Sequence, residues 1–235
     1  MALPKLNAGP SYQMMIPSTK DKVNYRPFLV KEEKNLMIAM ESNDSKSVIL
    51  TLLDTIKSCV SEPLSVDALT SFDMEYMFLQ IRSKSVGETT KIGLTCSECN
   101  TRNDVEINVS DIKVDVPDIE NKIALSDTIT LEMGWPTATD LVNSGISDEA
   151  TTEELFNLMT SCFKYVETED ERINMRDESE ADVKAFVESM SSVQFDKVKQ
   201  YIEQMPKLKH TIKYDCANCG HHNTTSVEGL NAFLS

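Results

Sequence analysis

The sequence predicts an α+β fold, in which a helical bundle region packs with a small antiparallel β part built around two zinc-knuckle hairpins of the zinc-ribbon type. Three observations support this prediction. Apolar residues recur at helical spacing through most of the first 88 residues. From residue 89 the pattern changes to alternation with a period of two. Two Cys-x-x-Cys motifs stand between alternating segments, at 96–99 and 216–219.

The first part of the chain, residues 1–88, is predicted as a hairpin followed by three helices. The hairpin strands lie in SYQMMI and VNYRPFLV, on either side of a polar turn. Pro27 stands in the second strand, and because proline cannot donate a ladder hydrogen bond, we expect that strand at a sheet edge. The amphipathic helices are expected over 32–41, 45–60 and 71–86.

The remaining residues, 89–235, are expected to form the two halves of a zinc ribbon around an inserted segment. The halves are predicted at 89–109 and 208–228, and the inserted segment, at 137–206, is predicted to be helical. Short strands are expected before it, around 112–116 and 128–133. We expect the whole chain to form one compact unit.

Within the inserted segment, helices are expected over 147–166, 179–190 and 191–205. The last two begin with serine capping signals. The stretch 167–182 is strongly acidic with few apolar residues, which predicts an exposed, mobile loop. The ending 228–234 is predicted as a short helix.

The two Cys-x-x-Cys motifs predict one structural zinc site. Structural zinc takes four nitrogen or sulfur ligands in a tetrahedron, and a Cys-x-x-Cys turn lets two thiolates point at the same ion. The first motif has no histidine near it, so it cannot complete a four-ligand site locally. We therefore expect a single ion shared across the 116 residues between the motifs. The predicted ligands are Cys96, Cys99, Cys216 and Cys219.

The cysteine motifs also permit roles without a shared zinc ion. A thioredoxin-like redox pair would follow a strand and open a helix, and neither motif does so. The thiols could also be reduced and free of metal, or one member of the set could be lost. His221 or His222 could replace a cysteine, although solvated turn residues are the favoured interpretation. Cys59 and Cys162 stand on apolar helical faces and are expected in the core.

Composition limits the classes of partner. The formal net charge is −15, from 23 basic and 38 acidic side chains, and such a surface repels nucleic-acid phosphates and anionic membranes. No apolar run approaches the roughly 18 residues of a membrane span. The first residues lack a basic start followed by an apolar run, so we expect no secretory leader and a reducing site of synthesis. Protein partners are therefore favoured.

No catalytic arrangement stands out in the sequence. Four thiolates would leave zinc no open position for activating water. A Gly-rich phosphate loop and a Gly-x-Ser-x-Gly elbow are both absent from the sequence. The acidic residues scatter over helical faces, as solvated charges do. We therefore expect a protein that is not an enzyme.

Three stretches carry a more specific signal: NYRPFLVKEEKNLMIAMES, FDMEYMFLQIRSKSVGE and QYIEQMPKLKHTIKYDCANCG. They resemble the baseplate hub proteins of T-even-type bacteriophages, a family with this hairpin, the PFLVKEEK helix start and two Cys-x-x-Cys knuckles. The resemblance covers nearly the whole chain. It implies a structural component or assembly factor of the tail baseplate hub, with other phage tail proteins as partners. The host cytoplasm during assembly and the virion tail are the implied locations.

A zinc-ribbon nucleic-acid-binding protein is the alternative to this interpretation. Such a protein should carry a basic stripe with aromatic residues along its binding face. The sequence offers only a small basic cluster, PKLKH, beside the second motif. Charge therefore favours the protein-binding interpretation.

Overall fold

A mixed α+β fold with small antiparallel sheets is seen in the computed structural model of the protein, which confirms the predicted class. The structure describes residues 9–42, 44–144 and 151–230. Among the helices within these ranges, none is both long and apolar enough to cross a bilayer.

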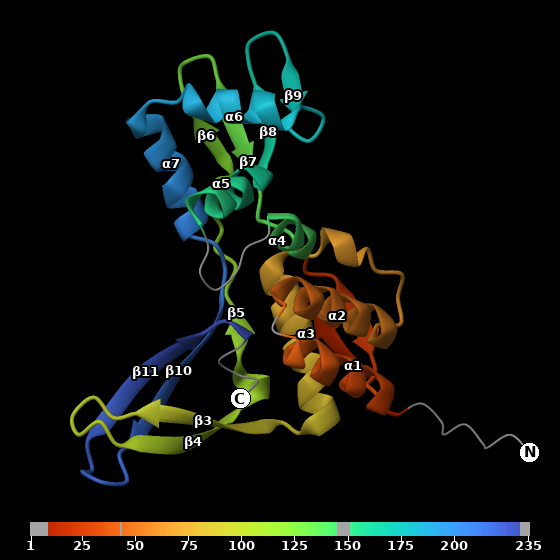
Figure 1. Cartoon of the computed structure of the whole chain (residues 1–235), viewed down its shortest axis with the longest axis vertical. Coiled ribbons are helices and arrows are strands. Elements are labelled where there is room, and N and C mark those ends of the chain that lie inside the picture. Colours follow the sequence, from red (N-terminus) through yellow and green to blue (C-terminus); the bar gives the residue numbers. More distant parts are fainter. Residues whose placement is uncertain (1–8, 43, 145–150, 231–235) are drawn as a thin grey trace, which may run out of the picture. The chain divides into compact units, whose positions relative to one another are not determined.

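Two compact units make up the chain (Figure 1). We call Met1–Asp115 together with Lys207–Ser235 the discontinuous unit, and Val116–Pro206 the inserted unit. Both ends of the sequence thus belong to the same unit, and the inserted unit interrupts it.

Three helices of the discontinuous unit form where apolar periodicity predicts them, so these predictions are confirmed. They are α1 (Val30–Glu41), α2 (Ser45–Cys59) and α3 (Ser71–Val86). The side chain of Asp44 accepts two backbone N–H groups at the start of α2, and Thr70 with Asp73 forms a capping box on α3. Fully buried side chains of α2 and α3 contribute to the core: Ile56, Met77, Leu79 and Ile81.

The predicted N-terminal hairpin is confirmed as β1 (Tyr12–Met15) paired with β2 (Lys22–Tyr25). Its turn is attached to α3, because Ser18 donates from its backbone N–H and its hydroxyl to the carboxylate of Asp73, at 2.9 and 2.5 Å. β2 ends two residues before Pro27. The proline therefore lies outside the strand in which it was expected.

Two longer hairpins of the discontinuous unit carry the Cys-x-x-Cys motifs in their turns. Their strands are β3 (Thr89–Thr95), β4 (Arg102–Asn108), β10 (Leu208–Asp215) and β11 (His222–Glu228), and the short strand β5 (Lys113–Val114) pairs with β10. Each turn has a positive φ directly after its second cysteine, 56° at Asn100 and 73° at Gly220. Asn and Gly tolerate this left-handed region, which lets both turns adopt the same form.

A four-stranded antiparallel sheet in the order β6-β7-β8-β9 forms the inserted unit together with helices. The elements are β6 (Lys122–Ala124), β7 (Thr130–Met133), α4 (Ala138–Ser144), α5 (Thr152–Ser161), β8 (Phe163–Glu167), β9 (Arg172–Asn174), α6 (Glu180–Glu188) and α7 (Ser192–Glu203). Leu131, Phe163 and Val198 are fully buried in one core. Trp135 stacks on Tyr201 with 4.5 Å between ring centroids.

The helix expected over 147–166 is wrong in its last part. α5 ends at Ser161, and the run from Phe163 to Val166 lies in β8, where both of these residues are buried. A short apolar run fits a buried helix and a buried strand equally well, so periodicity does not separate them. Residues 145–150, which this prediction also covered in part, lie outside the described residues.

The exposed loop expected over 167–182 is also wrong in part, because the segment contains β9. Arg172 explains why an acidic stretch forms a strand. Its guanidinium pairs with Glu132 at 2.8 Å and with Glu167 at 3.4 Å, and it lies over the ring of Tyr165. Cross-strand ion pairs therefore offset some of the repulsion in this stretch.

The predictions of two helices and two short strands are confirmed. α6 and α7 begin directly after the capping residues Ser179 and Ser191, as the sequence predicts. The strands expected around 112–116 and 128–133 appear in shorter form as β5 and β7. Of the helix predicted at 228–234, residues 231–234 lie outside the described residues, and Glu228 is the last residue of β11.

Candidate metal centre

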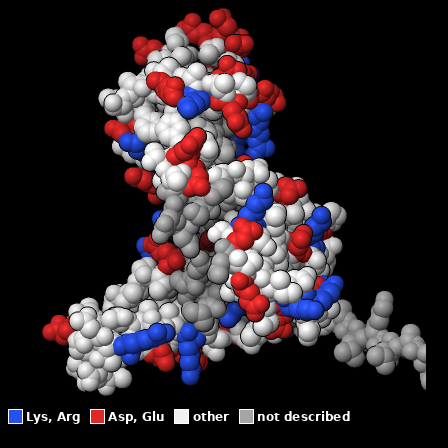
Figure 2. All heavy atoms as spheres, in the orientation of Figure 1, with Lys and Arg blue, Asp and Glu red and all other residues white. Residues whose placement is uncertain are grey.

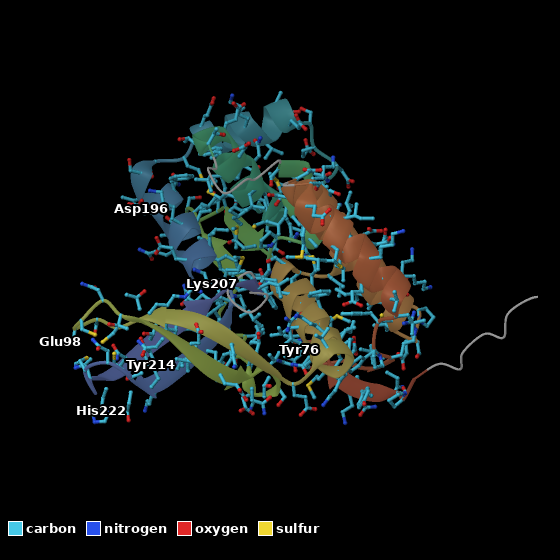
Figure 3. The ribbon with its side chains drawn as sticks, turned by 60° about the horizontal axis from the view of Figure 1, so that its bottom comes forward. Tyr76, Glu98, Asp196, Lys207, Tyr214 and His222 are labelled. Atoms are coloured by element: carbon cyan, nitrogen blue, oxygen red, sulfur yellow. The ribbon has the colours of Figure 1, made fainter. Side chains whose placement is uncertain are left out.

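The four predicted ligands, which stand in the turns of two hairpins, lie close together. Their sulfur atoms all lie within 4.8 Å of one another. Cys96 Sγ is 3.8 Å from Cys219 Sγ, and Cys99 Sγ is 3.6 Å from Cys216 Sγ. Figure 3 shows Glu98 and His222 at the ends of these hairpins, where sulfur atoms gather. The structure thus brings together residues 117 positions apart in the sequence.

The dimensions of this cluster suit a metal ion. At a zinc–sulfur distance of about 2.3 Å, tetrahedral geometry places neighbouring sulfurs roughly 3.8 Å apart. Two of the measured separations are 3.6 and 3.8 Å. All four thiols are free rather than joined in disulfides. The cluster could therefore hold one metal ion with four sulfur ligands.

The same backbone hydrogen bonds shape both turns. In the first, the N–H of Cys96 donates to the carbonyl of Thr101 at 2.9 Å, and Asn100 donates to the carbonyl of Cys96 at 3.0 Å. In the second, Cys216 and Gly220 make the corresponding bonds, both at 2.9 Å. The two motifs therefore present their sulfur atoms from equivalent backbone positions.

Asn103, on β4, joins the first hairpin to the second motif. Its side-chain carbonyl accepts the backbone N–H of Ala217 at 2.9 Å. Its amide nitrogen donates to Cys216 Sγ at 3.6 Å and to the carbonyl of Thr101 at 2.8 Å. The side chain is buried, so these bonds are shielded from water.

Asn223, on β11, makes the same contacts in the opposite direction. Its carbonyl accepts the backbone N–H of Ser97 at 3.0 Å, and its amide donates to Cys96 Sγ at 3.5 Å. Each hairpin thus holds the first cysteine of the other with one asparagine. We call Asn103 and Asn223 the asparagine pair.

The sequence interpretation missed the asparagine pair, although a signal for it exists. Each asparagine stands four positions after the second cysteine of its own motif, so both motifs read C-x-x-C-x-x-x-N. Asparagine is uncommon at a buried strand position, because its amide needs partners there. Its repetition at one spacing in two distant segments would have indicated a shared structural role.

Hydrogen bonds make the four thiols unequal. The hydroxyl and the backbone N–H of Thr101 lower the pKa of Cys99 to about 5, and the backbone N–H of Cys99 lowers the pKa of Cys96. The His221 backbone N–H favours the Cys219 thiolate, but hydrogen bonds with the other thiols outweigh it and raise the pKa of Cys219 to about 12. Thiolates so close together repel one another, and a bound cation removes that conflict.

The other cysteines behave differently. Cys59 and Cys162 are buried in the two units, as predicted, and neither belongs to the cluster. Burial raises the pKa of Cys59 to about 11 and that of Cys162 to about 12. The histidines near the second motif also stay outside the cluster, and Nδ1 of His222 contacts the exposed carboxylate of Asp215.

Comparison with protein families gives one match. A family model described as T4 bacteriophage base plate protein matches residues 9–235. The comparisons with curated proteins and with solved structures find no match.

Proposed function

Since the chain belongs to the T4 bacteriophage base plate protein family, we propose that it is a structural component or assembly factor of the baseplate hub that binds other tail proteins. The observation that carries this proposal is the family match over residues 9–235, nearly the whole chain. In this proposal the protein acts without catalysis, in the host cytoplasm during assembly or in the finished tail. Its partners are other phage tail proteins.

The proposal assigns one structural zinc ion to Cys96, Cys99, Cys216 and Cys219. The spacing of the sulfur atoms and their equivalent turns support this assignment. With four thiolates bound, zinc has no open position for water, so its contribution would be to hold the two hairpins together as a zinc ribbon. The asparagine pair would orient the ligands, as outer hydrogen-bond partners do in metal sites.

The binding surface in this proposal lies on α1, whose outward side carries large apolar side chains. Val30 and Met37 are two helical turns apart and are 79% and 58% exposed. Ile38 and Met40 flank them and are also more than half exposed, while Leu36 on the same helix is buried. A helix that is apolar on its outward side suits docking into a groove of another protein. We call Val30, Met37, Ile38 and Met40 the α1 surface.

Ion pairing weakens the case for nucleic-acid binding. Lys207 and Lys209, from the basic cluster beside the second hairpin, pair with Glu228 at 3.7 and 2.9 Å. A nucleic-acid interface needs cations that are available to replace counterions along a phosphate backbone. These contacts therefore favour a protein partner over the zinc-ribbon nucleic-acid binder.

Complementation of a phage that lacks this protein would test the proposal. We expect Val30→Lys combined with Met37→Lys to leave tails missing or baseplates incomplete while heads form normally. The variant should also fail to co-purify with other tail proteins. The matched control is Val193→Lys, at an apolar position 71% exposed on α7 of the inserted unit, which should complement.

The same assay tests the absence of catalysis. Single Asp→Asn or Glu→Gln changes at exposed positions should all complement, because no single carboxylate performs chemistry in this proposal. One such change that abolished tail formation, with folding and zinc content unchanged, would contradict a binding-only role.

A further inference from the structure

Nearly all of the net negative charge of the chain belongs to the inserted unit. Val116–Pro206 carries 20 acidic and seven basic side chains, a formal charge of −13, whereas the rest of the chain carries 18 acidic and 16 basic, a charge of −2. Figure 2 shows Asp and Glu crowded over the surface that this unit forms. The inserted unit therefore attracts cationic groups far more strongly than the discontinuous unit does.

A groove of about 970 Å³ lies in the inserted unit. Residues of α4, α5 and α6 and the segment after β9 line it. Part of its lining is apolar: Phe163 and Met175 are buried members of the core, and Phe156 and Val183 are partly buried against that core. α6 also contributes Ala181, whose small side chain is exposed. The groove thus offers apolar surface on a scale that suits several side chains of a partner.

The charged lining of this groove is mainly acidic. Four of its carboxylates and both of its cations stand on α5, on α6 or just after β9: Glu153, Glu178, Glu180, Glu188, Arg176 and Lys184. In the part of the chain that the structure describes, no ion pair engages any of these four carboxylates. A further lining carboxylate, Asp140, caps α4 through the backbone N–H of Thr137. Two carboxylates on the sheet of the unit, Glu132 and Glu167, are paired with Arg172.

We propose that this groove binds a basic amphipathic helix of a partner protein. Apolar side chains of that helix would pack against Phe156 and Val183, and its Lys or Arg side chains would reach Glu178 and Glu188. The apolar part of the lining suits apolar side chains rather than a hydrated metal ion, and the charge of the unit repels nucleic acid. Charge complementarity selects a basic helix over an acidic one.

This surface goes beyond the proposed function, because it does not involve the α1 surface or the metal centre. The α1 surface is apolar and belongs to the discontinuous unit, whereas the groove is acidic and belongs to the inserted unit. Two surfaces of different chemistry would let one chain contact two different partners.

A defined probe can test this with the full, metal-loaded chain. The probe is a model helix of about 18 residues made of leucine and lysine in an amphipathic pattern. A control peptide has the same composition with its leucines spread around the helix. With ¹³C-labelled methionine methyl groups, we expect the Met175 signal to shift on binding, because Met175 lines the groove. Met133, buried in the same core but absent from the groove lining, should stay unchanged.

Charge variants then separate the groove from the unit as a whole. Glu178→Lys with Glu188→Lys should weaken binding of the amphipathic peptide at least about tenfold. Asp118→Lys with Glu203→Lys changes the net charge equally at exposed positions outside the groove, and should weaken binding less than about threefold. Ala181→Arg adds bulk and positive charge at an exposed helix position, and should abolish binding with the unfolding temperature unchanged.

Three results would overturn the proposal. The control peptide could bind as tightly as the amphipathic one, or the two double variants could weaken binding equally, and either result would indicate unspecific charge attraction. Displacement of the peptide by millimolar Mg²⁺ at constant ionic strength would indicate a cation site instead. None of these readouts uses the α1 surface or tail assembly, so they leave the proposed function unaffected.

Discussion

The discontinuous and inserted units differ in the interactions that hold their elements together. In the discontinuous unit, two hairpins meet through Cys99 and Cys216, which are 117 positions apart, and four thiols stand where the hairpins meet. The inserted unit folds from the continuous stretch Val116–Pro206 around a sheet and an apolar core. Their formal charges also differ, −2 against −13.

One strand of the second hairpin in the discontinuous unit has little apolar burial. Among the seven residues of β11, only Asn223 is buried, and its amide is directed at the sulfur cluster rather than into apolar packing. Isolated two-stranded hairpins are marginally stable in water. The other hairpin strands do bury apolar side chains, including Ile92, Ile107 and Ile212. We therefore expect metal ligation by the four cysteines to add to apolar burial in the discontinuous unit, whereas the inserted unit depends on its apolar core around Leu131, Phe163 and Val198.

Removal of the proposed zinc ion should produce the largest difference in stability between the two units. We expect one zinc per chain by elemental analysis, and its structural binding is worth about 10–16 kcal/mol in zinc-finger peptides. Chelation, or Cys219→Ser, should therefore remove amide-exchange protection from both hairpins, at Ile92 and at Ile212. Leu131 in the inserted unit should keep its protection.

Two outcomes would contradict this expectation. If Cys219→Ser left the protection of Ile92 intact, the two motifs would be independent. Two zinc ions per chain, or iron with visible absorbance, would exclude the shared four-thiolate zinc site.

Truncating a core side chain of the inserted unit should destabilise that unit and leave the discontinuous unit unchanged. Leu131→Ala, at a fully buried position, should destabilise the inserted unit by about 2–5 kcal/mol. Trp135 is the only tryptophan in the sequence and packs on this core, so its fluorescence reports unfolding of this unit. Zinc content should remain unchanged. Loss of zinc in this variant would mean that the two units depend on each other.

The stability of the discontinuous unit should also depend on pH through Glu75, which the inserted unit does not contain. Burial raises the pKa of Glu75, on α3, from 4.5 to about 7, although the backbone N–H of Leu230 opposes the shift. Because this pKa is higher in the folded than in the unfolded chain, the free energy of unfolding decreases as pH rises from about 4.5 to about 7. Over this range the unfolded chain releases the proton more readily than the folded chain does. Glu75→Gln should therefore stabilise the discontinuous unit at pH 8 by about 1–3 kcal/mol, and by less at pH 6.

The readout for Glu75→Gln is amide exchange at Ile81, with the fluorescence of Trp135 as the control. The Trp135 transition should be the same in both proteins at both pH values. An equal gain at pH 6 and pH 8 would show that packing, rather than ionisation, explains the effect.

The asparagine pair should give the smallest change in stability. Asn103→Ala and Asn223→Ala should each cost about 1–2 kcal/mol and weaken zinc binding about 10–100-fold, because each removes bonds to the opposite motif. The two losses should be similar, since the contacts are equivalent. Asn218→Ala is the comparison variant and should cost less, because this exposed side chain makes a single hydrogen bond to the cluster, to Cys99 Sγ at 3.7 Å, and is not buried as the asparagine pair is. Competition with a chromophoric chelator would measure the three affinities.

Local signals account for what the sequence predicted well. The helices α2 and α3 have apolar periodicity and capping residues that agree, so their positions could be predicted. The meeting of the four cysteines could be predicted as well, because the first motif lacks any local partner. Both inferences depend on interactions close in sequence or on a fixed ligand number.

What the sequence did not predict depends on contacts between distant strands. The run that forms β8 is predicted as helix, because a short apolar run has no period that separates helix from strand. Its strand conformation depends on pairing with β7, where Val166 lies opposite Leu131. β9 is not predicted because Arg172 stabilises it through Glu132, which lies on β7 and 40 positions earlier. The asparagine pair is not predicted, although both motifs share the spacing C-x-x-C-x-x-x-N, because the contacts of each member are made with the opposite hairpin.

The separation of the two cysteine motifs also sets an order of events during translation. Ribosomes add about 5–20 residues per second, so the second motif emerges roughly 6–23 s after the first. In that interval the whole inserted unit leaves the ribosome, and it can fold while the first motif still lacks half of its ligands. A chain that stops early would never complete the four-sulfur cluster. A complete four-sulfur cluster would thus mark chains translated beyond Cys219.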